Sequence, residues 1–313
     1  MKPTLLDAPT PVQTRATDKR FKWVVAALPL QLAVASLISV AGWRDLGAAL
    51  FVATPLTVGG IAGFIRTWDQ MWRLLGLLLV VPSVILLFVG VEGLLCVAMA
   101  APLLAIVMML GYGIGRLYAI SRGVDVEDYH HAALWLPMAV FTVSSTVEHF
   151  VGLDYLPNET SLAVDLLQPP DEVFEAIIHV DTVKAAPSWL HTLGLPTPLA
   201  SHLDTLAVGG KRKCYLSDGI IHERLTKLNA PYYVAMDMGE ATMGRSWLRL
   251  WEDEYHLAET ADGGTRITHT THFGSNLRPR IYWAAVERYT VRAQHRMVFD
   301  NLKLDLATQP SID

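Results

Sequence analysis

The chain has 313 residues, 52% of them hydrophobic and only 18% charged, with a formal net charge of -5 at pH 7. That length is enough for two domains, and the negative charge argues against nucleic acid as a partner of the whole chain. The two cysteines, Cys96 and Cys214, argue against a disulfide framework and a cysteine-rich metal site.

Residues 1–22 are polar and contain three prolines, so we predict a flexible tail. The first apolar run after it is long for a signal peptide and more runs follow, which favours an uncleaved anchor. Each run is about long enough to cross a bilayer as a helix. We therefore predict a membrane domain over residues 23–153, with four or five transmembrane helices. The runs cover residues 23–41, 46–65, 74–91, 94–114 and 132–153.

Two glycines, Gly59 and Gly63, stand four residues apart in the second run. This spacing of small residues lets helices approach closely in a membrane, and a chance occurrence is an equal alternative. Glu92 and Gly93 lie between the third and fourth runs and are interpreted as a turn. A buried, functional Glu92 is the alternative.

The basic residues predict the orientation, because cytoplasmic loops carry an excess of Lys and Arg. Arg15, Lys19, Arg20 and Lys22 precede the first run and put the N-terminus in the cytoplasm, while residues 123–183 contain no Lys or Arg. If the weaker fifth run only lies in the interface, the C-terminal domain is cytoplasmic. We predict five spans instead: an integral, multi-pass plasma membrane protein with an extracytoplasmic C-terminal domain.

The remaining chain has the composition of a soluble domain, predicted over residues 158–308. Residues 161–167 favour a strand, and the helix after it starts at 169–172, where proline suits the first turn and acids favour the positive helix end. Residues 185–208 are expected to form a loop with one short helix. Alternating patterns and Gly-bearing turns then predict antiparallel strands over 211–216, 220–228, 232–238, 246–258 and 266–273.

A long helix is predicted over residues 279–306. Its apolar residues recur at steps of three, four or seven and form one stripe, which should lie on the sheet and make a cup. A basic flank is expected off that stripe, at Arg288, Arg292, His295 and Lys303. The stripe consists of Tyr282, Val286, Tyr289, Ala293, Met297 and Leu304.

Three stretches resemble the SRPBCC superfamily, which includes START-like domains, plant allergens and polyketide cyclase/dehydrase-like proteins. They are QPPDEVFEAI at 168–177, YHLAETADGGTRIT at 255–268, and the last helix. The resemblance covers the C-terminal half and implies a helix-grip fold with an apolar cavity for a hydrophobic ligand. The expected fold class is thus an α-helical transmembrane bundle plus an α+β helix-grip (SRPBCC/START-like) soluble domain.

One hairpin geometry suggests a polar pair inside the cup. If residues 262–263 form a two-residue turn, Asp253 faces His272, and His256 faces His269 on the opposite side of the sheet. The Asp253 face is the more apolar, so it should look into the cup. Asp253 and His272 are then candidates for an acid/base or anchoring pair, with a solvated cross-strand pair as the competing interpretation.

His256 and His269, with Glu254 beside them, offer two metal ligands, but two exposed histidines are the favoured interpretation. We therefore predict no metal and no cofactor. The sequence contains no HExxH, GxSxG, P-loop or paired CxxC motif. Eight residues could instead line a ligand cavity, with core filling as the alternative for any one of them: Trp189, Tyr215, Trp247, Trp251, Tyr255, Tyr282, Val286 and Tyr289.

The leading functional hypothesis is a membrane-tethered binding or carrier protein for a lipid or other hydrophobic small molecule. A polyketide cyclase/dehydratase-like enzyme using Asp253 and His272 is the first alternative, and a non-catalytic membrane signalling or interaction module is the second. No nucleic-acid partner is expected, and the oligomeric state stays open.

Overall fold

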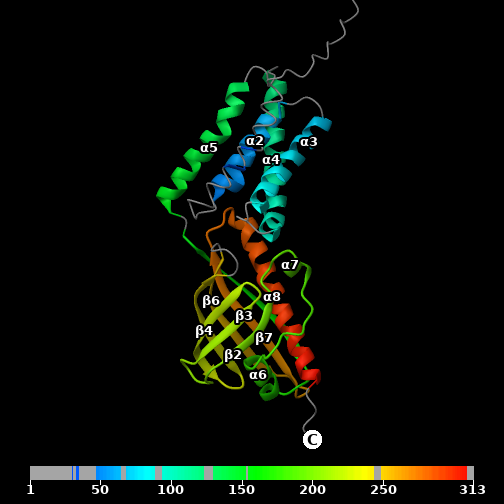
Figure 1. Ribbon diagram of the computed structural model, residues 1–313, viewed down its shortest axis with the longest axis vertical. Coiled ribbons are helices and arrows are strands. Elements are labelled where there is room, and N and C mark those ends of the chain that lie inside the picture. The colour runs from blue at the N-terminus through cyan, green and yellow to red at the C-terminus, as the bar shows by residue number, and fades with distance from the viewer. Residues whose placement is uncertain are drawn as a thin grey trace, which may run out of the picture.

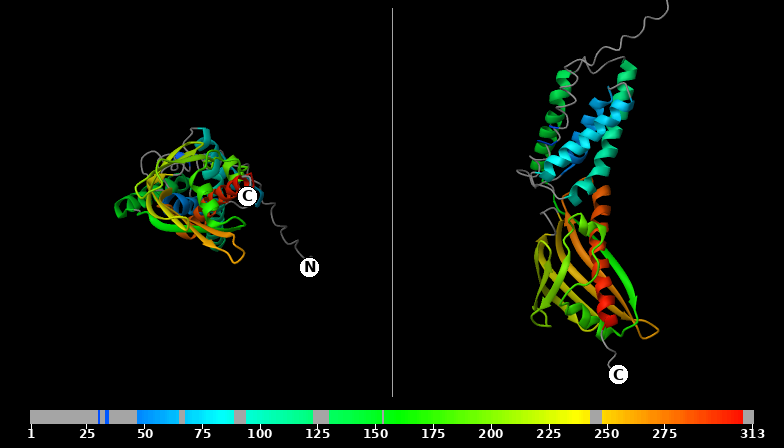
Figure 2. Two further views of the ribbon diagram at one scale, coloured as in Figure 1. Left: turned by 90° about the horizontal axis from the view of Figure 1, so that it is seen from below. Right: turned by 45° about the vertical axis from the view of Figure 1, so that its right-hand side comes forward.

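The computed structural model describes residues 30, 33–34, 47–64, 68–88, 94–122, 130–152, 154–242 and 248–308. Most of the predicted first run, the turn at Glu92 and Gly93, and Trp247 lie outside these residues. The described chain forms a group of helices at one end and a curled sheet with a long helix at the other (Figures 1 and 2).

The described part of the helical end contains a short π-helix that continues into the first of four α-helices. Their bounds are η1 (Ala49–Ala53), α2 (Thr54–Ala62), α3 (Trp68–Phe88), α4 (Leu94–Arg122) and α5 (His130–Val151). Four of the five predicted apolar runs are thus helices. Helix α3 begins at Trp68, six residues before the predicted run of 74–91. The carboxylate of Glu148 joins α5 to η1 by accepting the backbone N–H of Ala49 at 3.0 Å.

Glycines make the contact between α2 and α4. A Cβ added at Gly59 would lie 2.1 Å from the carbonyl oxygen of Met108, and one at Gly63 would lie 2.5 Å from the backbone nitrogen of Arg116. Both glycines therefore face α4 at a distance that only a residue without a side chain allows. On α4, Gly115 meets the backbone of α2 in the same way.

Within the described residues, α4 is the one helix long and apolar enough to cross a membrane. Residues 49–62 and 76–85 are apolar but form shorter stretches. The four or five transmembrane spans predicted above therefore stay a proposal.

The other end is a seven-stranded antiparallel sheet in the order β1-β7-β6-β5-β4-β3-β2, curled around the last helix (Figure 1). This is an α+β helix-grip, as the resemblance implied. Its elements are β1 (Leu156–Leu166), α6 (Pro170–Ile178), α7 (Trp189–Thr192), β2 (Pro198–Leu203), β3 (Lys211–Leu216), β4 (Gly219–Asn229), β5 (Tyr233–Thr242), β6 (Leu248–Glu259), β7 (Thr265–Ser275) and α8 (Arg280–Thr308).

Strand β2 is the element that the sequence prediction missed, since it lies within the expected 185–208 loop. It is the last strand of the sheet, next to β3, and on its other side Ser201 forms an isolated bridge with Val180. A proline at the start of an edge strand costs no ladder hydrogen bond, so Pro198 is compatible with pairing although it suggested a loop.

The predicted stripe of α8 does not lie on the sheet. Val291 packs on the sheet core, as do Phe299 and Leu302, whereas Tyr282 and Val286 pack against residues of η1 and α4. Ala293 contacts Leu95 and Leu190, and Leu304 is half-exposed. The interpretation was wrong because α8 has two partners. Tyr282, Val286, Tyr289 and Ala293 of the stripe face the helical end and α7, whereas Val291, His295 and Leu302 face the inside of the sheet.

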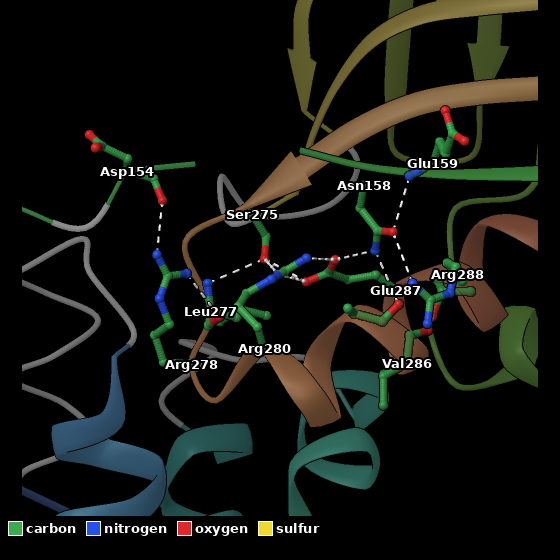
Figure 3. Close-up of polar contacts among 12 residues, drawn as sticks. Asp154, Asn158, Glu159, Ser275, Leu277, Arg278, Arg280, Val286, Glu287 and Arg288 are labelled. Atoms are coloured by element: carbon green, nitrogen blue, oxygen red, sulfur yellow. Dashed lines mark hydrogen bonds and ion pairs between the residues drawn. The ribbon is translucent and has the colours of Figure 1, made fainter. Parts of the chain in front are cut away.

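A buried ionic network fixes the start of α8 to the sheet (Figure 3). Glu287, whose side chain is fully buried, is bridged by Arg280 at 2.6 and 2.9 Å. It also accepts hydrogen bonds from Ser275 at 2.5 Å and Asn158 at 2.9 Å. Because a buried carboxylate needs several donors to offset its desolvation, these contacts hold β1, β7 and α8 in one arrangement.

Candidate functional site

A cavity of about 130 Å³ lies between the inner face of the sheet, α6 and α8. Its wall is mostly apolar, with side chains such as Ile221, Met238, Leu250 and Val298. Polar groups gather on one part of the wall, and they come from six different elements: Ser201, Arg212, Glu223, Asp253, His269, Thr271 and His295.

The β6–β7 hairpin places these groups through a register that differs from the predicted one. Glu259 pairs with Thr265, so the loop is longer than a two-residue turn. Asp253 therefore faces Thr271, and His272 faces Glu252. The predicted Asp253–His272 pair is wrong, because a shift of one residue moves a side chain to the other face of the sheet.

His272 lies on the outer face of the sheet. Its Nδ1 is 3.4 Å from Glu159 and its Nε2 is 3.8 Å from Glu254. His269 pairs with Tyr255 and lines the cavity, whereas His256 is exposed on the outer face. His256 and His269 therefore lie on opposite faces of the sheet, so the prediction that they could bind one metal ion together is wrong. The interpretation of His269 as an exposed residue is wrong as well.

A hydrogen-bonded cluster forms the polar part of the cavity wall. Thr271 donates its hydroxyl proton to Asp253, and the same hydroxyl lies 2.7 Å from Nε2 of His295. Nε2 of His269 lies 3.1 Å from Asp253. The rings of Tyr255, His269 and His295 form a stack, with centroid distances of 4.2 and 3.8 Å.

The cluster shifts the pKa values of its carboxyl and one imidazole. Burial alone would raise the pKa of Asp253, but His269, His295 and the Thr271 hydroxyl lower it to about 2. Burial and the neighbouring His269 lower the pKa of His295 to about 2, and Asp253 opposes this only in part. At neutral pH, Asp253 is therefore ionised and His295 is neutral.

A buried ion pair belongs to the same polar part of the wall, close enough to Asp253 to interact with its charge. Nη1 of Arg212 is 3.1 Å from Glu223, and both side chains are less than a tenth exposed. Nη2 of Arg212 donates to Ser201 at 3.0 Å and to the carbonyl of Ile177. Burial raises the pKa of Glu223 and Arg212 opposes it, while burial raises the pKa of the adjacent Cys214 thiol.

The structure brings only two of the eight predicted cavity residues, Tyr215 and Tyr255, into this cavity. Trp189, Val286 and Tyr289 line a second pocket of about 310 Å³ between α4, α7 and α8. Three others lie elsewhere. Tyr282 donates its hydroxyl to the carbonyl of Met99 on α4, Trp251 packs on Gly274 at a bulge in β6, and Trp247 is outside the described residues.

Sequence reasoning missed Arg212, Glu223, Thr271 and His295. Arg212 and Cys214 alternate on β3, and Ile221 and Glu223 alternate on β4, which places each pair on one face. On α8, Val291, His295, Val298 and Leu302 recur at steps of four, three and four. These spacings on β3, β4 and α8 could have indicated cavity-facing residues. Each series contains a charged or polar residue, however, which suggested a face exposed to solvent.

Asp253, His269 and His295 could hold a metal ion, since one ligand atom from each lies within 4.8 Å of the others. The two imidazole planes, however, are tilted by only 30° and stacked 3.8 Å apart. An ion is bound in the plane of an imidazole ring, so one ion cannot lie in both planes at bonding distance unless a ring rotates. The observed arrangement therefore suits hydrogen bonding better than coordination.

No protein-family model and no curated protein matches this sequence. Several solved structures are similar at low identity. A protein from Nitrosomonas europaea is 13% identical with a TM-score of 0.32, covering 48% of this chain and 97% of its own. A protein of unknown function from Staphylococcus aureus is 16% identical with a TM-score of 0.35, covering 50% of this chain and 100% of its own.

The Aha1 dimer from Colwellia psychrerythraea is 16% identical with a TM-score of 0.29, covering 46% of this chain and 95% of its own. Each of the three matches spans about half of this chain and nearly all of the other protein. The helix-grip assignment itself rests on the strand order and on the position of α8 in the curled sheet.

Proposed function

We propose that this protein binds a small apolar molecule, or the apolar part of a lipid, in the cavity between the sheet and α8. The observation that carries the proposal is a partly enclosed, mostly apolar cavity with one polar region, which is the usual composition of a small-molecule site. Its volume of about 130 Å³ is close to the roughly 150 Å³ that accommodates benzene. A one-ring molecule fits without rearrangement.

We further propose that the helical end is embedded in a membrane. Besides the apolarity of α4, large apolar side chains point outward from the helices: Leu117 is 71%, Trp135 73% and Phe150 82% exposed. Exposed apolar side chains of this size are costly in water and stable in lipid. The proposed arrangement is an integral, multi-pass membrane protein with a cytoplasmic N-terminus and an extracytoplasmic C-terminal domain.

The two halves of the proposal support one another physically. Apolar ligands concentrate in a bilayer, so a cup held at its surface collects them without a search through water. The pocket beside Trp189 and Tyr289 is apolar, and residues of α8 and of the start of α4 form part of its wall. Amphipathic aromatic side chains favour the membrane interface, so this pocket is a suitable place for an acyl chain on its way to the cavity.

The test is native mass spectrometry of the full chain, released from detergent micelles and from nanodiscs of defined lipid. The proposal expects bound apolar molecules that remain after detergent exchange and that added lipid or one-ring compounds displace. A protein that carries no ligand from either source, and takes up none when challenged, would contradict it.

A further inference from the structure

We infer that the molecule taken up by the cavity carries a hydrogen-bond donor, a hydroxyl or an amine, and that Nδ1 of His295 accepts it. The inference rests on the proposed binding function and adds the chemical class of the ligand: an apolar body with one donor group and no carboxylate. It follows from where the protons of the Asp253–Thr271–His295 cluster must lie.

The first step is the hydroxyl of Thr271. It has a single proton, and its oxygen lies within hydrogen-bonding distance of both Asp253 and Nε2 of His295. The Asp253 carboxylate is ionised and has no proton to donate. Thr271 must therefore donate to Asp253, and its oxygen must accept from Nε2–H of His295.

The second step is the other ring nitrogen of His295. The imidazole is 1% exposed, stacks on His269 and lies near Arg292, so a second proton on it would be unfavourable. Nδ1 of His295 then holds a lone pair, and no polar atom in the described part of the chain makes a hydrogen bond with it. A buried acceptor without a donor is unfavourable, and a ligand donor in the adjoining cavity would satisfy it.

The third step excludes other polar groups on the ligand. A carboxylate would place a second negative charge near Asp253, and the Nη1 and Nη2 groups of Arg212 are already bound to Glu223, Ser201 and the Ile177 carbonyl. An ether or a ketone has only acceptors and would leave Nδ1 of His295 unpaired. An alcohol or an amine supplies the missing proton without adding negative charge.

A matched set of one-ring probes tests the inference: phenol and aniline carry a donor, anisole only acceptors, and benzoate a negative charge. Binding to the full chain in detergent is measured by calorimetry, and a blank titration into protein-free micelles corrects for partition. We expect phenol and aniline to bind about tenfold more tightly than anisole, which corresponds to one hydrogen bond. Benzoate should bind most weakly.

Two variants make the comparison specific. His295→Phe keeps a ring of similar shape and should lower the affinity for phenol to that for anisole. His256→Phe makes the same substitution on the exposed outer face of β6 and should leave the preference unchanged. In case His295→Phe folds poorly, the ¹⁵N signal of Nδ1 of His295 in the wild-type protein provides an independent measurement. It should move when phenol binds and stay in place when anisole binds.

The outcomes separate this inference from the function beneath it. Equal binding of phenol and anisole, or tightest binding of benzoate, overturns the ligand class and leaves the cavity function standing. Binding of none of the four overturns the proposed cavity function and the inference with it. Tight binding of Zn²⁺ that requires both His269 and His295, together with loss of the preference for phenol, replaces the inference with a metal site.

Discussion

Arg212 and Glu223 form an ion pair with 3.1 Å between Nη1 and Oε2, buried in the cavity wall between β3 and β4. Both side chains are buried away from water, so each charge depends on its partner for stabilisation. This pair and the His295 cluster give the cavity its polar part, and both lead to measurable consequences.

Removing one member of the ion pair should be much more harmful than removing both. We expect Arg212→Met to lower the free energy of unfolding by about 3–5 kcal/mol, because Glu223 is left buried without its cation. The double variant Arg212→Met/Glu223→Met should recover more than half of this loss. Thermal unfolding of the full chain in detergent, followed by the circular dichroism of the sheet, measures both.

A surface pair provides the control for that experiment. Arg266 and Asp165 are bonded at 2.7 Å, but their side chains are 61% and 56% exposed. Because water screens such a pair, Arg266→Met should change stability little. A loss at Arg266 as large as that at Arg212 would contradict the role given to burial.

Protein stability should fall as the pH drops below about 6.5. His295 has a pKa of about 2 in the folded state and about 6.5 when unfolded, so between these values only the unfolded state binds the extra proton. Its contribution is lost at up to about 1.4 kcal/mol per pH unit. Burial lowers the pKa of His191 as well, which acts in the same direction.

The variant His295→Phe should flatten this slope between pH 6.5 and 4, whereas His256→Phe should not. Asp253 does not interfere in that window, because its folded pKa of about 2 lies below its unfolded value of 3.8. Its contribution is present above pH 3.8 and is lost between pH 3.8 and 2. An unchanged slope in His295→Phe would mean that His295 is not held neutral. Unfolding midpoints measured across this pH range provide the comparison.

Gly115 and Gly113 on α4 should respond differently to the same substitution. A Cβ at Gly115 would lie 1.9 Å from the carbonyl oxygen of Gly60, so Gly115→Ala must push α2 and α4 apart. A loss of about 1–3 kcal/mol is expected. Nothing lies within 4 Å of a Cβ at Gly113, so Gly113→Ala should be neutral or stabilising by up to about 1 kcal/mol. Thermal unfolding in detergent compares the two, and equal effects would count against close packing of these helices.

The membrane topology is testable with reporter fusions. With five spans, a reporter that is active only in the cytoplasm should be silent when fused after Asp313 and active when fused before Met1. Activity at both ends would indicate an even number of spans and a cytoplasmic cavity domain. The measurement depends most on α5, which corresponds to the weaker fifth run.

The resemblance and the residue patterns were sufficient to predict most elements of the sheet domain. Alternation of apolar and polar residues located the ends of β3 to β7 to within two residues, except the end of β5, because a sheet with one buried face imposes a period of two. The proline and the acidic residues at its start located α6. The spacing of Gly59 and Gly63 indicated a close helix contact, which the closeness of both glycines to the backbone of α4 supports. These are local properties of the chain.

The arrangement of the site was decided by tertiary structure. The length of the 260–264 loop sets the register of β6 and β7, and one residue of difference exchanges His272 for His269 on the inner face. Similarly, the sequence of α8 has two faces, and only its position between the sheet and α4 determines which one lines the cavity. His295 was assigned to a basic flank, off the apolar stripe. Its burial depends on Thr271 and His269, which lie more than twenty residues away along the chain and meet it only in the folded protein.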